Sequence, residues 1–476
     1  MSRPGFPGGA ALLEGPIVPS LLKLAVPIVF ANVLQSAYQL TDAFWVGRLG
    51  GAAVAAVSVS FPIIFLLIAL GMGFGIAGST LVAQYQGAGN SRMVNHVAAQ
   101  TLVMVVLTSA VLGGLGIAIA PGLLGLMGVA SDVYPDAVLF MRISCLGLVV
   151  VFGFAMFQAV MRGIGQVTMP LYIVLGTVLL NVVLDPLFIF GWGPIAGQGV
   201  AGAAWATIGT QSIAAVIGLG TLLGGRYGIH LQWGDFRPDW AFVQRAFRLG
   251  FPASIESSAR GLGMTAMTFL IATFGTVAIA SYGIGSNVFM FVLIPAMGLS
   301  MATAALVGQH IGANKIERAT HIAHLSAGIA FVSLSLVGLA VYATADSIVA
   351  FFVPGDAAVV AEGARFLRLF APTFGFIGLQ LAFIGVFRAA GQMLAAMALA
   401  LISQWVLQFP LALVLGRYTS WGLEGVWWAF PISTVLTTIG ATVWFMRGGW
   451  KQGRLTEDEK AVEEASEEIL VEEGVR

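Results

Sequence analysis

Charged residues are scarce in this chain. Asp, Glu, Lys and Arg make up only 9% of its 476 residues, whereas 58% are hydrophobic. Soluble proteins carry about 25% charged residues, so the composition predicts a protein that crosses the lipid bilayer many times. The 22 basic and 22 acidic residues cancel to a net charge of zero. We therefore expect no basic face for nucleic acid and no nucleic-acid partner.

Cysteine and the motifs of soluble enzymes are nearly absent. The single cysteine, Cys145, excludes an intramolecular disulfide and is interpreted as a small packing residue. The five histidines lie near predicted loops without a cluster of carboxylates or cysteines around them. No Gly-Lys-Ser/Thr phosphate-binding loop is present. We expect no cofactor, no enzymatic activity and no use of ATP, which leaves an ion gradient as the energy source for any work that the protein does.

Long apolar runs are what the sequence has in abundance. An α-helix needs ~20 mostly apolar residues to span a bilayer. Twelve such runs are present, at 20–47, 52–81, 94–120, 134–160, 168–191, 199–223, 241–273, 277–305, 319–343, 359–387, 393–415 and 422–446. The sequence therefore predicts an all-α membrane protein.

The two halves of the chain resemble one another. Leu24 to Pro27 align with Leu249 to Pro252, and Val82-x-Gln84 aligns with Val307-x-Gln309, both at a shift of 225 residues. Each half holds six predicted spans, so both cross the membrane in the same sense. The predicted architecture is two six-helix lobes related by a pseudo-two-fold axis along the membrane normal, with a cavity between them.

Positively charged loops orient the predicted helices. Lys and Arg gather in one set of loops, which includes Arg92, Arg162 and Arg318. Such loops face the cytoplasm, so both termini are predicted on the cytoplasmic side of the cell membrane. The predicted parts are a lead-in, the N-terminal lobe, a cytoplasmic inter-lobe loop, the C-terminal lobe and an acidic cytoplasmic tail: 1–16, 17–223, 224–240, 241–446 and 447–476.

The acids Asp42 and Asp185 inside the predicted spans have no counterpart in the second half. Asp42, Asn181 and Asp185 have hydrophobic residues at the matching positions of the second half. Asp42 and Asp185 lie about one and a half turns from the outer ends of their helices, and Thr207 lies about two turns inside its own. We therefore expect these side chains at one level of the outer half, around a hydrated cavity in the first lobe.

Further polar residues follow the same helix faces. Thr177, Asn181 and Asp185 recur at i, i+4 and i+8, and Gln35 and Tyr38 precede Asp42 on one face of the first span. These spacings predict that Gln35, Tyr38, Thr177 and Asp42 line the hydrated cavity of the first lobe, and these four are the candidate residues for binding a ligand there.

Two carboxyl groups in such a cavity have a specific chemistry. Burial disfavours the charged form, and each carboxylate disfavours ionisation of the other, so a proton or a cation is expected between them. Na⁺ prefers oxygen ligands, and Asn181 Oδ1 and Thr207 Oγ1 would add two to those of Asp42 and Asp185. The alternative interpretation is structural: Asp42 caps its helix, and neighbouring hydroxyl groups satisfy Asp185.

Pro27 interrupts the hydrogen bonding of the first span by leaving the Lys23 carbonyl without its helical donor. We consider two interpretations, a hinge that responds to the protonation of Asp42 and a static kink for packing. Pro252 repeats the feature in the second half, without a matching aspartate.

Glu256 is the other intramembrane acid. Arg260 follows at i+4, the favoured order for a helical ion pair, so self-neutralisation is expected. The alternative is a second proton or cation site.

Several of these motifs together resemble the multidrug and toxic compound extrusion (MATE) family over about residues 14–446. They are Leu24-Ala25-x-Pro27, Gln35-x-x-Tyr38-x-x-x-Asp42, Val82-x-Gln84-x-x-Gly87-Ala88 with its repeat, Arg162-Gly163-x-Gly165 and Asn181-x-x-x-Asp185-Pro186. Within the family the chain looks most like the prokaryotic branch related to the DNA-damage-inducible members. Another branch uses acids in the tenth helix, where this chain has none after Glu362.

The resemblance implies an antiporter with a V-shaped pair of lobes that exports organic, mostly cationic or amphipathic compounds in exchange for H⁺ or Na⁺. It makes Asp42 and Asp185 the coupling acids, with Asn181 and Thr207 as partners, and a monomer is expected. The alternative within transport is a lipid-linked precursor flippase. Such flippases tend to have a strongly cationic cavity, whereas the basic residues inside these spans are chiefly Arg142 and Arg260.

Overall fold

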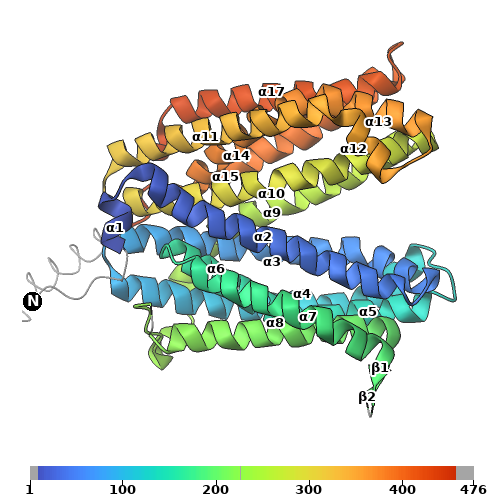
Figure 1. Cartoon of the computed structure of the whole chain (residues 1–476). Coiled ribbons are helices and arrows are strands. Elements are labelled where there is room, and N and C mark those ends of the chain that lie inside the picture. The colour runs from blue at the N-terminus through green and yellow to red at the C-terminus, as the bar shows by residue number, and fades with distance from the viewer. Residues whose placement is uncertain (1–8, 194, 226, 457–476) are drawn as a thin grey trace, which may run out of the picture.

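The computed structural model describes residues 9–193, 195–225 and 227–456 (Figure 1). The greater part of the predicted acidic tail lies outside these residues. The elements, in chain order, are α1 (Gly9–Glu14), α2 (Ile17–Gly47), α3 (Gly51–Gly87), α4 (Ser91–Leu126), α5 (Tyr134–Leu146), α6 (Leu148–Gly163), α7 (Thr168–Phe190), β1 (Gly191–Trp192), β2 (Ile195–Ala196), α8 (Gly199–Leu223), η1 (Trp233–Phe236), α9 (Trp240–Ala272), α10 (Thr276–Gly312), α11 (Ile316–Ala343), α12 (Ala345–Phe352), α13 (Ala357–Phe370), η2 (Ala371–Thr373), α14 (Phe374–Ala389), α15 (Met393–Leu401), η3 (Ile402–Gln408), α16 (Phe409–Arg417), α17 (Leu423–Met446) and η4 (Gly449–Gln452).

Long apolar helices dominate the described residues. Ten helical stretches are long and apolar enough to cross a membrane, and the bent pair of α5 and α6 makes an eleventh. The remaining predicted span is α9, which has 33 residues but carries several charges, among them Glu256 and Arg260. The all-α membrane fold class predicted from the sequence is thus confirmed, and its twelve spans agree with this arrangement.

Some spans are less regular than the sequence predicts. The expected continuous helix at 134–160 bends by 43° where α5 meets α6. Gly147 lies at this bend, and a Cβ there would come within 2.5 Å of Ile208 Cγ1 on α8. The expected helix at 359–387 is interrupted by a 3₁₀ turn that contains Pro372, and the next one contains a π-helix. The close approach of α8 at Gly147 accompanies the first break, and the missing N–H of Pro372 accompanies the second.

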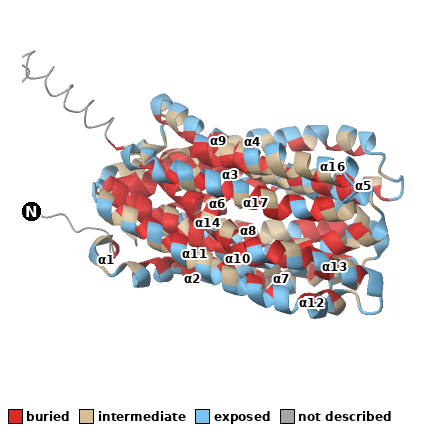
Figure 2. Ribbon diagram, turned by 90° about the horizontal axis from the view of Figure 1, so that it is seen from above, coloured by how far each residue is buried: buried red, intermediate tan, exposed pale blue. Residues whose placement is uncertain are grey.

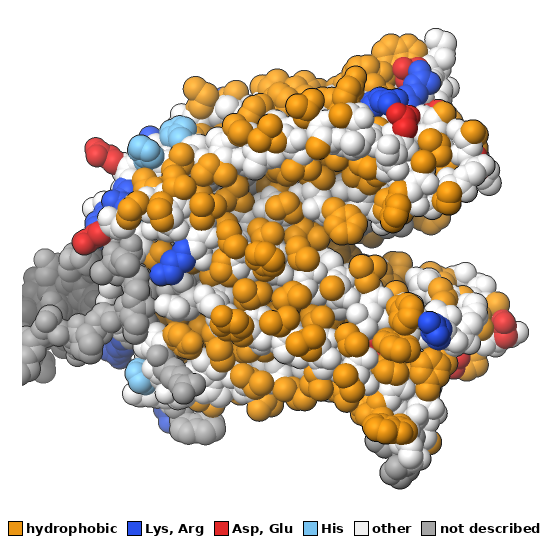
Figure 3. All heavy atoms as spheres, viewed as in Figure 1, with side chains coloured by type: hydrophobic (Ala, Val, Ile, Leu, Met, Phe, Trp, Pro, Cys, Tyr) orange, Lys and Arg blue, Asp and Glu red, His pale blue; other side chains and the backbone are white. Residues whose placement is uncertain are grey.

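The helices form two lobes (Figure 1). A cleft separates the lobes at the end of the molecule away from the N-terminus, which we call the open end (Figure 3). The opposite end, which holds Gln84 and Gln309, is called the closed end, and buried residues gather toward it (Figure 2). Hydrophobic side chains cover much of the long outer surface in Figure 3, as a surface in contact with lipid requires.

Two helices, α2 and α9, each contribute residues to the hydrophobic cores of both lobes. On α2, residues up to Ile28 pack in the core of the second lobe, and residues from Tyr38 onward pack in that of the first. On α9, residues up to Ala253 pack in the first core and residues from Met267 in the second. The change of partner on α2 falls between Ile28 and Tyr38, so the predicted hinge at Pro27 lies just before the segment in which this helix passes between lobes.

The closed end is joined by a duplicated pair of hydrogen bonds. Gln84 of α3 donates from Nε2 to the Ala389 carbonyl oxygen at 2.7 Å, and Gln309 of α10 donates from Nε2 to the Gly163 carbonyl oxygen at 2.8 Å. Both glutamines are buried. They occupy matching positions in the two halves, so the repeat seen in the sequence has a spatial counterpart between the lobes.

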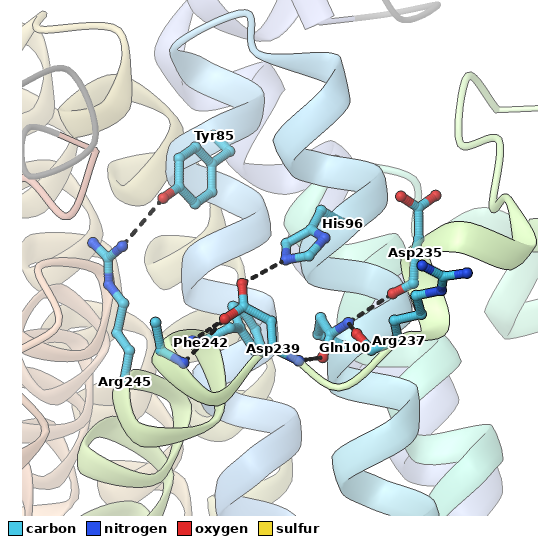
Figure 4. A network of polar contacts seen from close by, with 9 residues as sticks. Tyr85, His96, Gln100, Asp235, Arg237, Asp239, Phe242 and Arg245 are labelled. Atoms are coloured by element: carbon cyan, nitrogen blue, oxygen red, sulfur yellow. Dashed lines mark hydrogen bonds and ion pairs between the residues drawn. The ribbon is translucent and has the colours of Figure 1, made fainter. Parts of the chain in front are cut away.

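The loop between the halves is fastened to α4 (Figure 4). Gln100 donates from Nε2 to the carbonyl oxygens of Asp235 and Arg237, at 2.7 and 2.6 Å, and accepts from the Asp239 N–H at 3.1 Å. His96 Nε2 lies 3.2 Å from Asp239 Oδ2. Partial burial opposes the charge of Asp239, but the N–H groups of the first turn of α9 and the His96 ring outweigh it and hold the pKa of this carboxyl below its ordinary value.

Candidate functional site

The predicted ion-coupling residues meet inside the first lobe. Asp42 comes from α2, Asn181 and Asp185 from α7, and Thr207 from α8. Asn181 donates from Nδ2 to Asp185 Oδ1 at 2.7 Å, and Thr207 donates from Oγ1 to Asp42 Oδ2 at 3.3 Å. The carboxyl groups of Asp42 and Asp185 also lie close enough to interact electrostatically. Asp185 and Asn181 are fully buried.

Three buried oxygens of this group have no hydrogen-bond donor among the described residues. They are Asp42 Oδ1, Asn181 Oδ1 and Asp185 Oδ2. Unpaired buried oxygens on two carboxyl groups are costly, because neither water nor a donor balances their charge. A proton shared by the carboxyl groups would supply a donor, and a hard cation would take these same oxygens as ligands.

Tyr38 extends the polar group toward the closed end. Its hydroxyl lies 2.5 Å from Thr210 Oγ1, and both side chains are buried. Thr210 in turn donates to the Thr207 carbonyl oxygen at 2.9 Å, so Tyr38 is the donor of the pair. Thr210 is a member of the site that was not predicted from the sequence, although its position one turn after Thr207 on α8 is a signal that points to it.

The other predicted residues lie on the same helices with different surroundings. Thr177 is buried, and its hydroxyl donates to the Val174 carbonyl oxygen of its own helix at 2.9 Å. Gln35 is half-buried on α2, about two turns before Asp42. Pro27 lies inside α2, which continues as one helix from Ile17 to Gly47. Their roles in substrate binding and bending remain predictions.

Glu256 lies in the second lobe and contacts two arginines. Its Oε1 accepts from Arg260 at 3.0 Å and from Arg388 at 2.8 Å. The ion pair predicted at i, i+4 is therefore present, and Arg388 of α14 is a second partner that sequence spacing did not reveal. Glu256 is fully buried, and the arginines supply the positive charge that a buried carboxylate needs.

Within the described residues, no three His, Cys, Asp or Glu side chains are grouped as a metal site. The candidate cation ligands in the first lobe are instead two carboxyl groups, one amide and one hydroxyl. Such a set offers oxygen atoms alone, which suits a proton or a hard monovalent cation better than a transition metal.

Comparison with known proteins agrees with this arrangement. The MatE family model matches the chain twice, over residues 27–187 and 252–414. The probable multidrug resistance protein YpnP of Bacillus subtilis is 28% identical over 449 residues, which cover 93% of this chain and 98% of the relative. The probable multidrug resistance protein YoeA of the same organism is 28% identical over 444 residues, covering 92% and 95%.

A solved structure has the same fold. It is described as the outward-facing conformation of a multidrug resistance MATE family transporter, and it superposes with a TM-score of 0.87 at 22% identity, covering 94% of this chain and all of that one. The two family matches fall on the two halves of the sequence repeat and together span most of the chain. The chain therefore belongs to the MATE family of multi-pass membrane transporters.

Proposed function

We propose that this protein is a multidrug efflux antiporter, which exports organic, mostly cationic or amphipathic compounds in exchange for H⁺ or Na⁺. The observation that carries the proposal is the set of unpartnered buried oxygens on Asp42, Asn181 and Asp185. The names of the relatives, multidrug resistance proteins, support the substrate class.

The acid pair supplies the coupling. With both carboxyl groups ionised, the first-lobe site carries two negative charges and attracts a cationic substrate. A proton or Na⁺ at Asp42 and Asp185 removes that attraction, so ion and substrate binding oppose each other. Negative coupling of this kind is all that exchange requires thermodynamically.

The conformation supports export by alternating access. The lobes are joined at the closed end and separated by a cleft at the open end. We assign the closed end to the cytoplasm, with both termini on that side of the cell membrane, and regard the protein as a monomer. Substrate leaves through the open end when the ion binds, and the lobes then rock to expose the cavity inward.

Dye efflux tests the proposal. Purified protein in liposomes should export a fluorescent cationic dye under a proton gradient or a sodium gradient applied separately, and the effective gradient names the ion. Asp42→Asn and Asp185→Asn should each reduce efflux by at least about tenfold, the consequence of losing roughly 1.4 kcal/mol of coupling. Asp136→Asn is the matched control, because Asp136 is an exposed acid at the start of α5.

Normal efflux by both site variants would refute a coupling role for the acids. The alternative of a lipid-linked precursor flippase is not favoured by the relatives named above. It would be supported if the wild-type protein exported no dye under either gradient but moved a lipid-linked saccharide.

A further inference from the structure

The second lobe contains a cavity of about 130 Å³. Aromatic rings form much of its wall, contributed by Tyr282, Phe289, Phe366, Phe370 and Phe430. Amide and hydroxyl side chains lie among them, including Gln380, Gln404 and Ser286. Mostly apolar walls with a few convergent polar groups are typical of small-molecule sites.

Arg260 gives this cavity its charge. It is the one charged side chain among the described residues that line the cavity, and it is 38% exposed. Glu256 does not cancel the local charge, because its single carboxylate is shared between Arg260 and Arg388. Two arginines against one glutamate leave an excess of one positive charge beside an aromatic cavity.

A π-helix forms part of the cavity wall. Residues Ile402–Gln408 adopt this wider helix within a span that is otherwise α-helical. Ser403, Gln404 and Gln408 from this segment all line the cavity. The segment packs closely on α9, since a Cβ at Gly263 would lie 2.0 Å from Gln404 Cγ. Short π-helical segments are rare and occur frequently at functional sites.

We propose that this cavity binds a planar aromatic compound that carries a carboxylate. The carboxylate pairs with Arg260, whose guanidinium has five N–H donors and gives one of them to Glu256 Oε1. The ring of the ligand lies against the phenylalanine walls, and the π-helical amides bind its polar substituents. A cationic ligand is disfavoured here, because no acidic side chain lines the cavity within the described residues.

The two lobes therefore prefer ligands of opposite charge. The first lobe offers two acids to a cation, and the second offers one arginine to an anion. Gly261, next to Arg260, packs against Phe65 of the first lobe, so the cavity lies beside the seam at which the lobes move. The inference rests on the proposed export function for the fate of the ligand, and it extends the cargo to aromatic acids.

Equilibrium binding separates this inference from the export mechanism, because it requires no gradient. Purified protein in detergent would be titrated with radiolabelled 2-naphthoate and with the neutral 2-naphthamide. We expect the wild-type protein to bind the carboxylate at least tenfold more tightly than the amide. Arg260→Gln should abolish that preference. Arg142→Gln is the matched control, because Arg142 lies on α5 of the first lobe and is exposed.

Glu256→Gln provides the decisive second variant. Removing this carboxylate frees both arginines, so binding of 2-naphthoate should tighten, a gain that damage to the fold cannot produce. Equal affinity of wild type for the two probes, an unchanged preference in Arg260→Gln, or no tightening in Glu256→Gln would each overturn the proposal. Loss of dye efflux in Asp42→Asn concerns the first-lobe site and leaves this result unaffected.

Discussion

Asn181 satisfies one oxygen of a fully buried carboxyl group and has no counterpart in the second half of the chain. Asn181→Leu, which copies the second-half residue type, removes the 2.7 Å hydrogen bond to Asp185 Oδ1. We expect a loss of about 1–3 kcal/mol in the free energy of unfolding, the usual cost of an unsatisfied buried acceptor. The loss should be larger at high pH than at low pH, because the charged carboxylate needs donors more than the protonated acid does. Thermal unfolding in detergent, measured at both low and high pH, reports the loss of stability and its pH dependence.

Val178→Ala is the control for that measurement, because Val178 is a buried apolar residue on the same helix. Its destabilisation should not depend on pH. A pH-independent effect of Asn181→Leu would contradict a role for Asn181 in holding the ionised acid.

At this scale the sequence predicted the main members of the site. Asp42, Asn181 and Asp185 stand out because a membrane interior tolerates such groups only with partners, and the repeat shows that the fold does not require them. Thr210 does not stand out, since a threonine in an apolar helix is often bonded to its own backbone. Arg388 was not connected to Glu256, because 132 residues separate the two and no local spacing relates them.

The helices α3 and α10 touch backbone to backbone at the closed end. A Cβ at Gly87 would lie 1.8 Å from the Gln309 carbonyl oxygen, and one at Gly312 would lie 1.9 Å from the Gln84 carbonyl oxygen. Gly87→Ala and Gly312→Ala should therefore each push the helices apart and cost about 1–3 kcal/mol. The midpoint of thermal unfolding and the distance between spin labels on the two helices report the change.

Gly283→Ala tests the same substitution on α10 where space is open. Beyond the adjoining backbone of α10 itself, no atom of the described residues lies within 4 Å of a Cβ at this position. The variant should be neutral or should gain up to ~1 kcal/mol from better helix propensity. If it is as damaging as Gly312→Ala, helix contact is not the cause of the effect.

The hydropathy of the sequence predicted where the helices lie, but it did not predict where they bend or change helix type. Apolar runs locate the spans because the bilayer sets their length and composition. The bend at Gly147 and the π-helix at Ile402–Gln408 depend on side chains from other helices, Ile208 and the surface around Gly263. Such tertiary contacts have no local signature, so a sequence read helix by helix shows neither feature.

The molecule as a whole has a two-fold repeat, but the hydrogen bonds at its closed end differ between the two halves. Among the residues that the structure describes, the Gln309 side chain makes one hydrogen bond across the lobes, to the Gly163 carbonyl oxygen. Gln84 makes three: besides Ala389 it donates to the Gly453 carbonyl oxygen at 3.0 Å and accepts from the Leu455 N–H at 2.7 Å. The chain after α17 thus crosses from the second lobe to α3 of the first and fastens one side of the seam.

This asymmetry predicts unequal effects on opening. A buried hydrogen bond contributes about 0.5–1.5 kcal/mol, and 1.4 kcal/mol is a tenfold change in population. Gln84→Leu should therefore raise the population with an opened closed end more than tenfold, and Gln309→Leu by less. Spin labels at Arg92→Cys and Glu317→Cys, exposed and equivalent in the repeat, measure that opening in a Cys145→Ser background. Equal shifts in the two variants would mean that the bonds between Gln84 and the segment around Leu455 add nothing to closure.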